Sequence, residues 1–199
     1  MKTDKQKIAK IISVIGHPLL TIPLFVAIMM FAFEDIEKAL VNSALIIACI
    51  FLPLCLRMYF KSKIGTYTNF DVSDRIQRKT LFTFIIPIMI VVTIISFITS
   101  PDSNFSISVL FGTILVIISQ ITNLFIKSSL HVSLNIYLAA LATTADLRIG
   151  IAILLLTGLI AWSRIALGRH TRKEVALGYI IGLTISITML LVEGFFKSF

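Results

Sequence analysis

Apolar segments of membrane-spanning length, separated by short polar loops, occupy most of this 199-residue chain. A transmembrane helix needs about 20 mostly apolar residues, or roughly 17 at the low end. Seven such segments follow one another: residues 11–33, 39–60, 80–99, 105–126, 128–145, 149–167 and 175–195. Because backbone polar groups in lipid must be satisfied within the protein, these lengths predict helices. We therefore expect an all-α, polytopic membrane helix bundle with six to seven transmembrane helices.

The composition predicts one integral-membrane domain over residues 1–199. Hydrophobic residues make up 57% of the chain and charged residues 14%, whereas apolar residues make up about half of a soluble domain. The net charge of +8 would suggest nucleic-acid binding in a soluble protein. Here the basic residues lie in short loops between apolar segments, without interleaved aromatic residues. We therefore expect them to set the topology and contact membrane lipids, and we expect no nucleic acid as a partner.

Two of the apolar segments are irregular. Residues 11–33 contain Pro18 and Pro23, and proline kinks membrane helices. In the same segment, His17 is either a functional group, because ionisable residues are costly in lipid, or a neutral side chain bonded to a backbone carbonyl that the kink frees. Residues 128–145 reach spanning length only by including polar residues, which suits a central helix that faces protein.

Polar clusters follow the second, fourth and sixth segments, at residues 71–79, 127–131 and 163–174. If every segment crosses the membrane, the three clusters lie on the face that also holds the N-terminus. If residues 128–145 do not cross, the last cluster lies on the opposite face. A single site built from all three clusters therefore requires this short segment to cross.

The last cluster carries the strongest chemical signal. Its arginines, lysine and histidine lie between two membrane-length segments, which suggests an anion site at the bilayer surface. Glu174 follows His170 by four residues, so on a helix the two side chains share a face. The carboxylate would then hold the imidazole in one tautomer and raise its nucleophilicity. Thr171 and Glu174 also fit a capping box, which would start the last helix without any catalysis, and the two roles are compatible.

This cluster resembles the third signature of the phosphatidic acid phosphatase type 2 superfamily, which reads Ser-Arg, five residues, His, three residues, Asp. Ser163, Arg164 and His170 match it, and Glu174 stands where Asp is usual. The resemblance implies that His170 attacks phosphorus, that Glu174 orients it and that Arg164 binds the phosphate. It also implies a phosphatidic acid phosphatase type 2-like core over residues 78–182.

The middle cluster is similar to the second signature of the same superfamily, Pro-Ser-Gly-His. Ser129 and His131 match it, whereas Ser128 replaces Pro and Leu130 replaces Gly. The resemblance implies that His131 is the general acid that protonates the leaving oxygen. Ser129 and the N–H groups at the start of the helix would bind phosphate. The alternative is a serine N-cap followed by a histidine in the first helical turn.

The first signature, Lys, six residues, Arg-Pro, matches only in part. Arg78 stands at the Arg position, Lys79 at the Pro position, and Asp71 where the Lys is expected. The resemblance implies that Arg78 binds phosphate, with Arg75, Lys79 and Lys127 as candidates to replace the missing lysine. The alternative is that the basic residues of residues 75–79 only set the topology.

The function that the resemblance implies is an integral-membrane lipid phosphatase. It would hydrolyse a lipid phosphate or a prenyl diphosphate through a phosphohistidine intermediate, without metal or other cofactor. Two alternatives stay open: a relative that binds or moves anionic lipids without hydrolysis, and a phosphotransferase that uses the same site. Phosphate release by the purified protein would distinguish the phosphatase from the non-hydrolytic relative. Candidate acceptors added during turnover would reveal a phosphotransferase.

The distribution of basic residues predicts the orientation. With seven crossings, all but three of the 18 basic residues fall on the N-terminal face, and only Lys38, Arg148 and Lys197 fall opposite. Short loops rich in Lys and Arg stay in the cytoplasm. We therefore expect a multi-pass protein of the cell membrane with its N-terminus and its phosphate site in the cytoplasm and its C-terminus outside.

Overall fold

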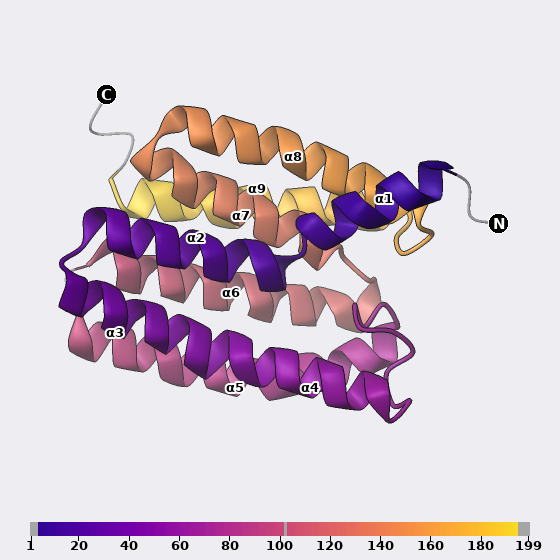
Figure 1. The fold of residues 1–199 in the computed structure, drawn as a ribbon, viewed down its shortest axis with the longest axis horizontal. Coiled ribbons are helices and arrows are strands. Elements are labelled where there is room, and N and C mark those ends of the chain that lie inside the picture. The colour runs from indigo at the N-terminus through magenta and orange to yellow at the C-terminus, as the bar shows by residue number, and fades with distance from the viewer. Residues whose placement is uncertain (1–3, 102, 195–199) are drawn as a thin grey trace. The chain divides into compact units, whose positions relative to one another are not determined.

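The computed structural model describes residues 4–101 and 103–194, and the regular secondary structure in this part of the chain is helical (Figure 1). Lys2, Phe195 and Lys197, which entered the predictions above, lie outside the described residues. The chain forms two compact units: the first holds the residues up to Thr21 and those from Phe125 onward, and the second holds Ile22–Leu124. Each unit is described here by itself.

The first unit contains α1 (Asp4–Ile15), α7 (Leu130–Ala145), α8 (Leu147–Ala166) and α9 (Arg172–Val192). The second unit contains α3 (Ile36–Ile46), the π-helical turn η1 (Ile47–Phe51), α4 (Leu52–Lys63), α5 (Arg75–Thr99) and α6 (Asn104–Phe125). Helix α2 (Pro18–Phe33) begins in the first unit and continues into the second. Every predicted segment therefore corresponds to helix, and the all-α prediction is confirmed.

Helix lengths support a multi-pass membrane protein. Five helical stretches are long and apolar enough to cross a membrane, namely Ile36–Lys63, α5, α6, α8 and α9, and the bent pair α1 and α2 would make a sixth. Helix α7 is apolar but has only 16 residues, or about 24 Å at 1.5 Å per residue. The hydrocarbon core is about 30 Å thick, so the length of α7 falls short of that thickness. This agrees with the sequence, in which residues 128–145 reached spanning length only by including polar residues.

The first predicted segment is two helices instead of one kinked helix. Helix α1 ends at Ile15 and α2 begins at Pro18, with Gly16 and His17 between them. A proline disfavours helical conformation in the residue before it, but its fixed φ suits the first position of a new helix. His17 also caps α2, because its Nδ1 accepts a hydrogen bond from the Leu19 N–H at 3.1 Å. The break therefore falls at His17, while Pro23 lies inside α2.

In the second unit, local sequence explains the irregular middle of the long stretch Ile36–Lys63. Pro53 has no N–H and its ring displaces the carbonyl four residues earlier; that residue, Cys49, lies within η1. Helices α5 and α6 are joined by buried hydroxyls: Thr93 and Thr113 bond at 2.8 Å, and the Ser106 hydroxyl donates to the Ser96 carbonyl at 2.8 Å.

In the first unit, small residues let α7 lie close against its two neighbours, α8 and α9 (Figure 1). A Cβ atom at Gly178 of α9 would lie 2.7 Å from the carbonyl oxygen of Ser129. One turn later, a Cβ atom at Gly182 would lie 3.0 Å from the Ser133 backbone. On the other side, a Cβ atom at Gly150 of α8 would lie 2.9 Å from the Ala139 carbonyl oxygen. Such close approach of backbones is how membrane helices gain packing energy without a hydrophobic drive.

The chain direction in this unit determines which ends meet. Helices α7, α8 and α9 follow one another as antiparallel neighbours (Figure 1). The start of α7, the end of α8 and the start of α9 therefore share one end of the unit. The Ser129 N–H donates to the Glu174 carbonyl at 3.1 Å, which fixes this meeting point. The last two polar clusters lie together here, whereas the first, residues 71–79, belongs to the second unit.

Candidate functional site

The loop that carries His170 is shaped by the way α8 ends. Gly168 has a φ of +65°, the left-handed conformation that glycine adopts without strain. The Gly168 N–H donates to the Ile165 carbonyl at 2.9 Å and the Arg169 N–H to the Arg164 carbonyl at 3.0 Å. This pair of bonds is a Schellman motif, which satisfies the last carbonyls of a helix. The chain consequently reverses at Gly168 and brings His170 back against the end of α8, where its N–H donates to the Arg164 carbonyl.

His170 and Glu174 form a buried, directly bonded pair. Nδ1 of His170 lies 2.9 Å from Oε2 of Glu174, and His170 is 5% exposed. The same Oε2 accepts the Thr171 N–H at 3.1 Å, and the Thr171 hydroxyl accepts the Glu174 N–H at 3.3 Å. The capping box and the imidazole–carboxylate contact are therefore both present, and one carboxylate serves both.

Lys127 contacts the same carboxylate. Its Nζ lies 3.5 Å from Oε2 of Glu174 and donates to the Arg169 carbonyl at 2.9 Å. Both charged side chains are less than one fifth exposed. Lys127 thus links the segment before α7 to the His170 loop and balances the charge of Glu174.

Ser129 directly precedes α7 but its side chain does not cap the helix. It occupies the N-cap position, yet its side chain makes no capping hydrogen bond. The residue is fully buried, and the described part of the chain offers its hydroxyl no hydrogen-bond partner. A buried hydroxyl without a partner is costly, so the capping interpretation leaves this side chain unexplained. It lies instead at the N-terminal end of a helix, where the amide dipoles favour an anion.

Arg164 is fully buried, in the last turn of α8. One terminal nitrogen of its guanidinium, NH1, donates to the Ser13 hydroxyl at 2.7 Å. A buried guanidinium needs partners of this kind because an uncompensated charge is very unfavourable away from water. The sequence interpretation gave α1 no role in the site. The sequence does contain one indication of such a role, because Ser13 is a hydroxyl residue within an otherwise apolar run.

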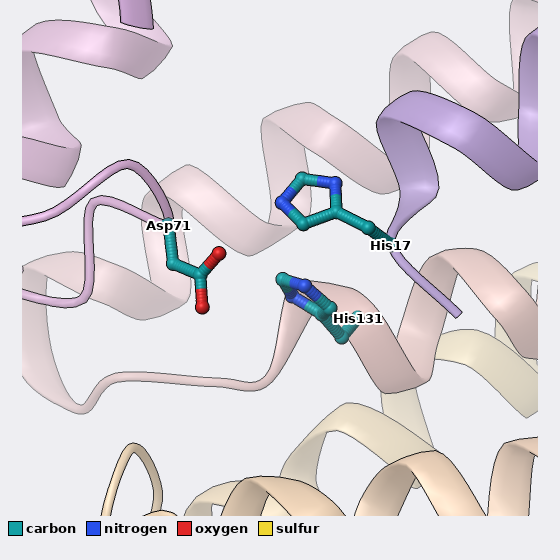
Figure 2. Close-up of side chains that lie close together, drawn as sticks. All are labelled: His17, Asp71 and His131. Carbon is teal, nitrogen blue, oxygen red and sulfur yellow. The ribbon is translucent and has the colours of Figure 1, made fainter. Parts of the chain in front are cut away.

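His131 lies in the first turn of α7, 6% exposed, and a second imidazole is packed on it. The rings of His17 and His131 meet edge to face, with centroids 4.6 Å apart and planes 80° apart (Figure 2). Asn135 ties the same two segments together, because its Nδ2 donates to the Gly16 carbonyl at 3.0 Å and to the His131 carbonyl at 2.7 Å. The break after α1 is therefore attached to the start of α7.

The remaining predicted residues, Arg75, Arg78 and Lys79, belong to the second unit, as does Asp71, which Figure 2 also labels. Arg78 is 4% exposed and its Nε donates to the Val72 carbonyl at 3.4 Å, whereas Arg75 and Lys79 are exposed. Val72 has a φ of +46°, an unusual conformation for a β-branched residue. Asp74 caps α5 through the N–H groups of residues 76 and 77.

A surface pocket also lies in the first unit, between α1 and the loop after α8. It is lined by Gln6, Lys10, Leu167, Gly168 and Arg169. Two of these side chains are basic, and Arg169 directly precedes His170. The structure thus gathers six predicted site residues at one end of the first unit: Lys127, Ser129, His131, Arg164, His170 and Glu174.

Fold and site together define a multi-pass membrane protein with a buried imidazole–carboxylate pair at one end of a helical unit. Comparisons with models of protein families, with curated proteins and with solved structures found no match to this chain. The chemistry of the residues themselves is therefore the basis for a function. An oriented imidazole, a second imidazole, a buried guanidinium and a hydroxyl at a helix start that has no hydrogen-bond partner among the described residues are suited to binding an anion and attacking it.

Proposed function

We propose that this protein is an integral-membrane lipid phosphatase that hydrolyses a lipid phosphate or a prenyl diphosphate through a phosphohistidine on His170. The contact of 2.9 Å between Nδ1 of His170, whose side chain is buried, and Oε2 of the partly buried Glu174 carries the proposal. A histidine held in this way presents its other nitrogen, Nε2, as the nucleophile. The proposal agrees with the resemblance to the phosphatidic acid phosphatase type 2 signatures.

In the first step, Nε2 of His170 attacks the phosphorus and a P–N bond forms. The P–O bond to the lipid breaks, and the departing oxygen takes a proton from His131. Glu174 stabilises the positive charge that develops on His170, because its carboxylate is already bonded to the opposite side of the ring. Such interactions accelerate the reaction since they strengthen on the way to the transition state.

In the second step, water attacks the phosphohistidine. The P–N bond breaks, one proton of the water passes to His131, and orthophosphate leaves. His170 and His131 return to their starting protonation states, so the cycle consumes only the lipid phosphate and water. General acid and base catalysis of this kind contributes roughly a hundred- to ten-thousand-fold.

Arg164 and Ser129 are the proposed phosphate ligands in the first unit. A guanidinium donates two parallel hydrogen bonds to a phosphate, and the unpartnered Ser129 hydroxyl lies at the start of α7 beside the helix amides. Lys127, which contacts Glu174, stays a candidate for phosphate binding. The phosphate-binding roles of Arg75, Arg78 and Lys79 stay predictions from the sequence.

Phosphate release by the purified protein tests the function. The panel contains phosphatidate, a prenyl diphosphate and the soluble p-nitrophenyl phosphate, each with and without a chelator. We expect release from at least one lipid and none from His170→Ala. The control is Ser186→Ala, which removes a buried hydroxyl of α9 twelve residues beyond Glu174. Lipid binding without phosphate release would favour the non-hydrolytic relative, and transfer to an added alcohol would favour the phosphotransferase.

A further inference from the structure

Helix α1 buries small residues, one of them a serine, against the rest of the first unit and exposes most of its aliphatic residues. Ala9 and Ser13 are buried and lie four residues apart, on the same side of the helix. Ile8, Ile11, Val14 and Ile15 are each more than half exposed. The side of α1 that packs on α8 therefore carries a hydroxyl, while its aliphatic residues face away from the unit.

Ser13 reaches the functional arginine of α8. Its hydroxyl accepts a hydrogen bond of 2.7 Å from Arg164, which is fully buried. The backbone carbonyl of Arg164 accepts the N–H groups of Arg169 and His170 at 3.0 and 3.2 Å. Arg164 is thus held at its side chain by α1 and at its backbone by the loop that carries His170. A change at Ser13 would alter where the guanidinium points without touching His170 itself.

His17 reaches the proposed general acid. Its Nδ1 accepts a hydrogen bond of 3.1 Å from the Leu19 N–H. The bond fixes the ring at the start of α2. From there the ring lies perpendicular to that of His131, with 4.6 Å between centroids (Figure 2). Asn135 holds the backbones of Gly16 and His131 together beside this contact.

We propose that Ser13 and His17 are positioning residues of the active site: Ser13 sets the direction of the Arg164 guanidinium, and His17 sets the orientation of the His131 ring. The inference rests on the proposed function, and it assigns a role to a segment that lies outside the family resemblance at residues 78–182. The same reasoning explains why the chain places a serine and a histidine in its first apolar segment. Neither residue contacts the reacting atoms in this assignment.

Ser13→Ala tests the first half of the proposal, that Ser13 sets the direction of the Arg164 guanidinium. The variant loses the hydrogen bond to Arg164, while Ser13→Thr keeps a hydroxyl and Ser186→Ala serves as the control. We expect the KM for the lipid phosphate and the Kd for orthophosphate to rise about ten- to a hundredfold, the range for a hydrogen bond to a charged group. The kcat should change less, and Ser13→Thr should recover most of the affinity. An unchanged Kd for orthophosphate in Ser13→Ala would overturn this half.

Two variants of His17 test the histidine half. His17→Asn keeps an acceptor for the Leu19 N–H but removes the ring, and His17→Phe keeps a ring but removes the acceptor. A phosphate ester of an alcohol needs its leaving oxygen protonated, whereas p-nitrophenol leaves unaided. We expect His17→Asn to lower kcat about tenfold or more on the lipid monophosphate, a fraction of the general-acid contribution, with little change on p-nitrophenyl phosphate. His17→Phe should lower kcat on the lipid monophosphate less than His17→Asn does. If kcat falls equally on both substrates and in proportion to the fall in Tm, His17 has a structural role only and the assignment is overturned.

Failure of this inference is distinguishable from failure of the proposed function. If the wild type turns over, His170→Ala does not, and both Ser13→Ala and His17→Asn match Ser186→Ala, only the positioning roles are wrong. If His170→Ala retains turnover, the proposed function is wrong. If no substrate is turned over, orthophosphate binding still decides on Ser13: a loss of affinity in Ser13→Ala supports its role, and no loss contradicts it.

Discussion

Glu174→Gln separates catalysis from helix capping. Oε2 of Glu174 accepts from Nδ1 of His170 at 2.9 Å and from the Thr171 N–H at 3.1 Å. Glutamine is as good as glutamate at this position of a capping box, and its amide oxygen can still accept one of these bonds. What the substitution removes is the negative charge beside His170.

The size of the effect follows from that charge. Opposite unit charges about 4 Å apart attract by about 4 kcal/mol at an effective dielectric constant of about 20. The Glu174 side chain is 17% exposed and the amide keeps part of the interaction, so about 3 to 4 kcal/mol is an upper bound. Since each 1.36 kcal/mol is a factor of ten in rate, we expect a measurable fall in kcat of at most roughly 10²- to 10³-fold. The free energy of unfolding should fall by about 1 kcal/mol or less, because the capping box survives.

The assay measures phosphate release from the preferred lipid in detergent, with Tm recorded on the same preparations. Thr171→Ala is the matched control: it removes the hydroxyl that accepts the Glu174 N–H but leaves the carboxylate on His170. We expect Thr171→Ala to lose about 1 kcal/mol of stability and to keep most of its rate. The reasoning is refuted if Glu174→Gln lowers Tm without lowering kcat, because the carboxylate would then serve the helix alone.

Three further predictions concern the general acid, the helix packing and the orientation. His131→Ala should lose more activity on a lipid monophosphate than on p-nitrophenyl phosphate, and equal losses would contradict its role as the acid that protonates the leaving oxygen. Gly178→Ala should destabilise by about 1–3 kcal/mol and lower activity, because its Cβ would lie 2.7 Å from the Ser129 carbonyl oxygen. Gly158→Ala, whose Cβ would lie 4.0 Å from the Tyr179 hydroxyl, should not destabilise, and chemical unfolding of both variants checks this. In a protein without Cys49 and Cys55, a cysteine placed at Ser103 should react with an impermeant maleimide on intact cells, and a cysteine placed at Thr68 should be protected. The reverse pattern would overturn the cytoplasmic orientation. Labelling at both positions would overturn the number of membrane crossings between them.

Much of the fold was predictable because membrane-length apolar runs leave few alternatives to helix. The first segment was expected to be one kinked span, and the chain instead breaks there into two helices bent by 40°, the first of which begins at Asp4. The cause is local: Pro18 restarts the helix and His17 caps it, and this alternative to a simple kink depends on one side-chain bond. The short α7 was recognisable from its polar residues, which Asn135 illustrates by bonding to two backbone carbonyls.

The candidate site was predictable where residues lie close in sequence. The four-residue spacing of His170 and Glu174 predicted their contact, although His170 lies just before α9, and the capping role of Thr171 follows from its three-residue spacing to Glu174. The partners from α1 were not predictable, because Ser13 and Arg164 are 151 residues apart and no spacing rule joins them. Their meeting depends on how α1 packs on α8. The same holds for His17 and His131, whose contact is a property of tertiary packing.

The most direct test of the central proposal is a search for phosphate bound to His170. The His131→Ala protein is incubated with p-nitrophenyl phosphate, which needs no acid to leave, and is then quenched in base, where phosphohistidine is stable. Without His131 to activate water, the intermediate should persist, and mass analysis of the peptide that contains His170 should show one added phosphoryl group. The same peptide from a protein that also carries His170→Ala should show none. Nitrophenol release without any phosphoryl group on His170, or an equal amount of label elsewhere in the doubly substituted protein, would contradict the assignment of His170 as the nucleophile.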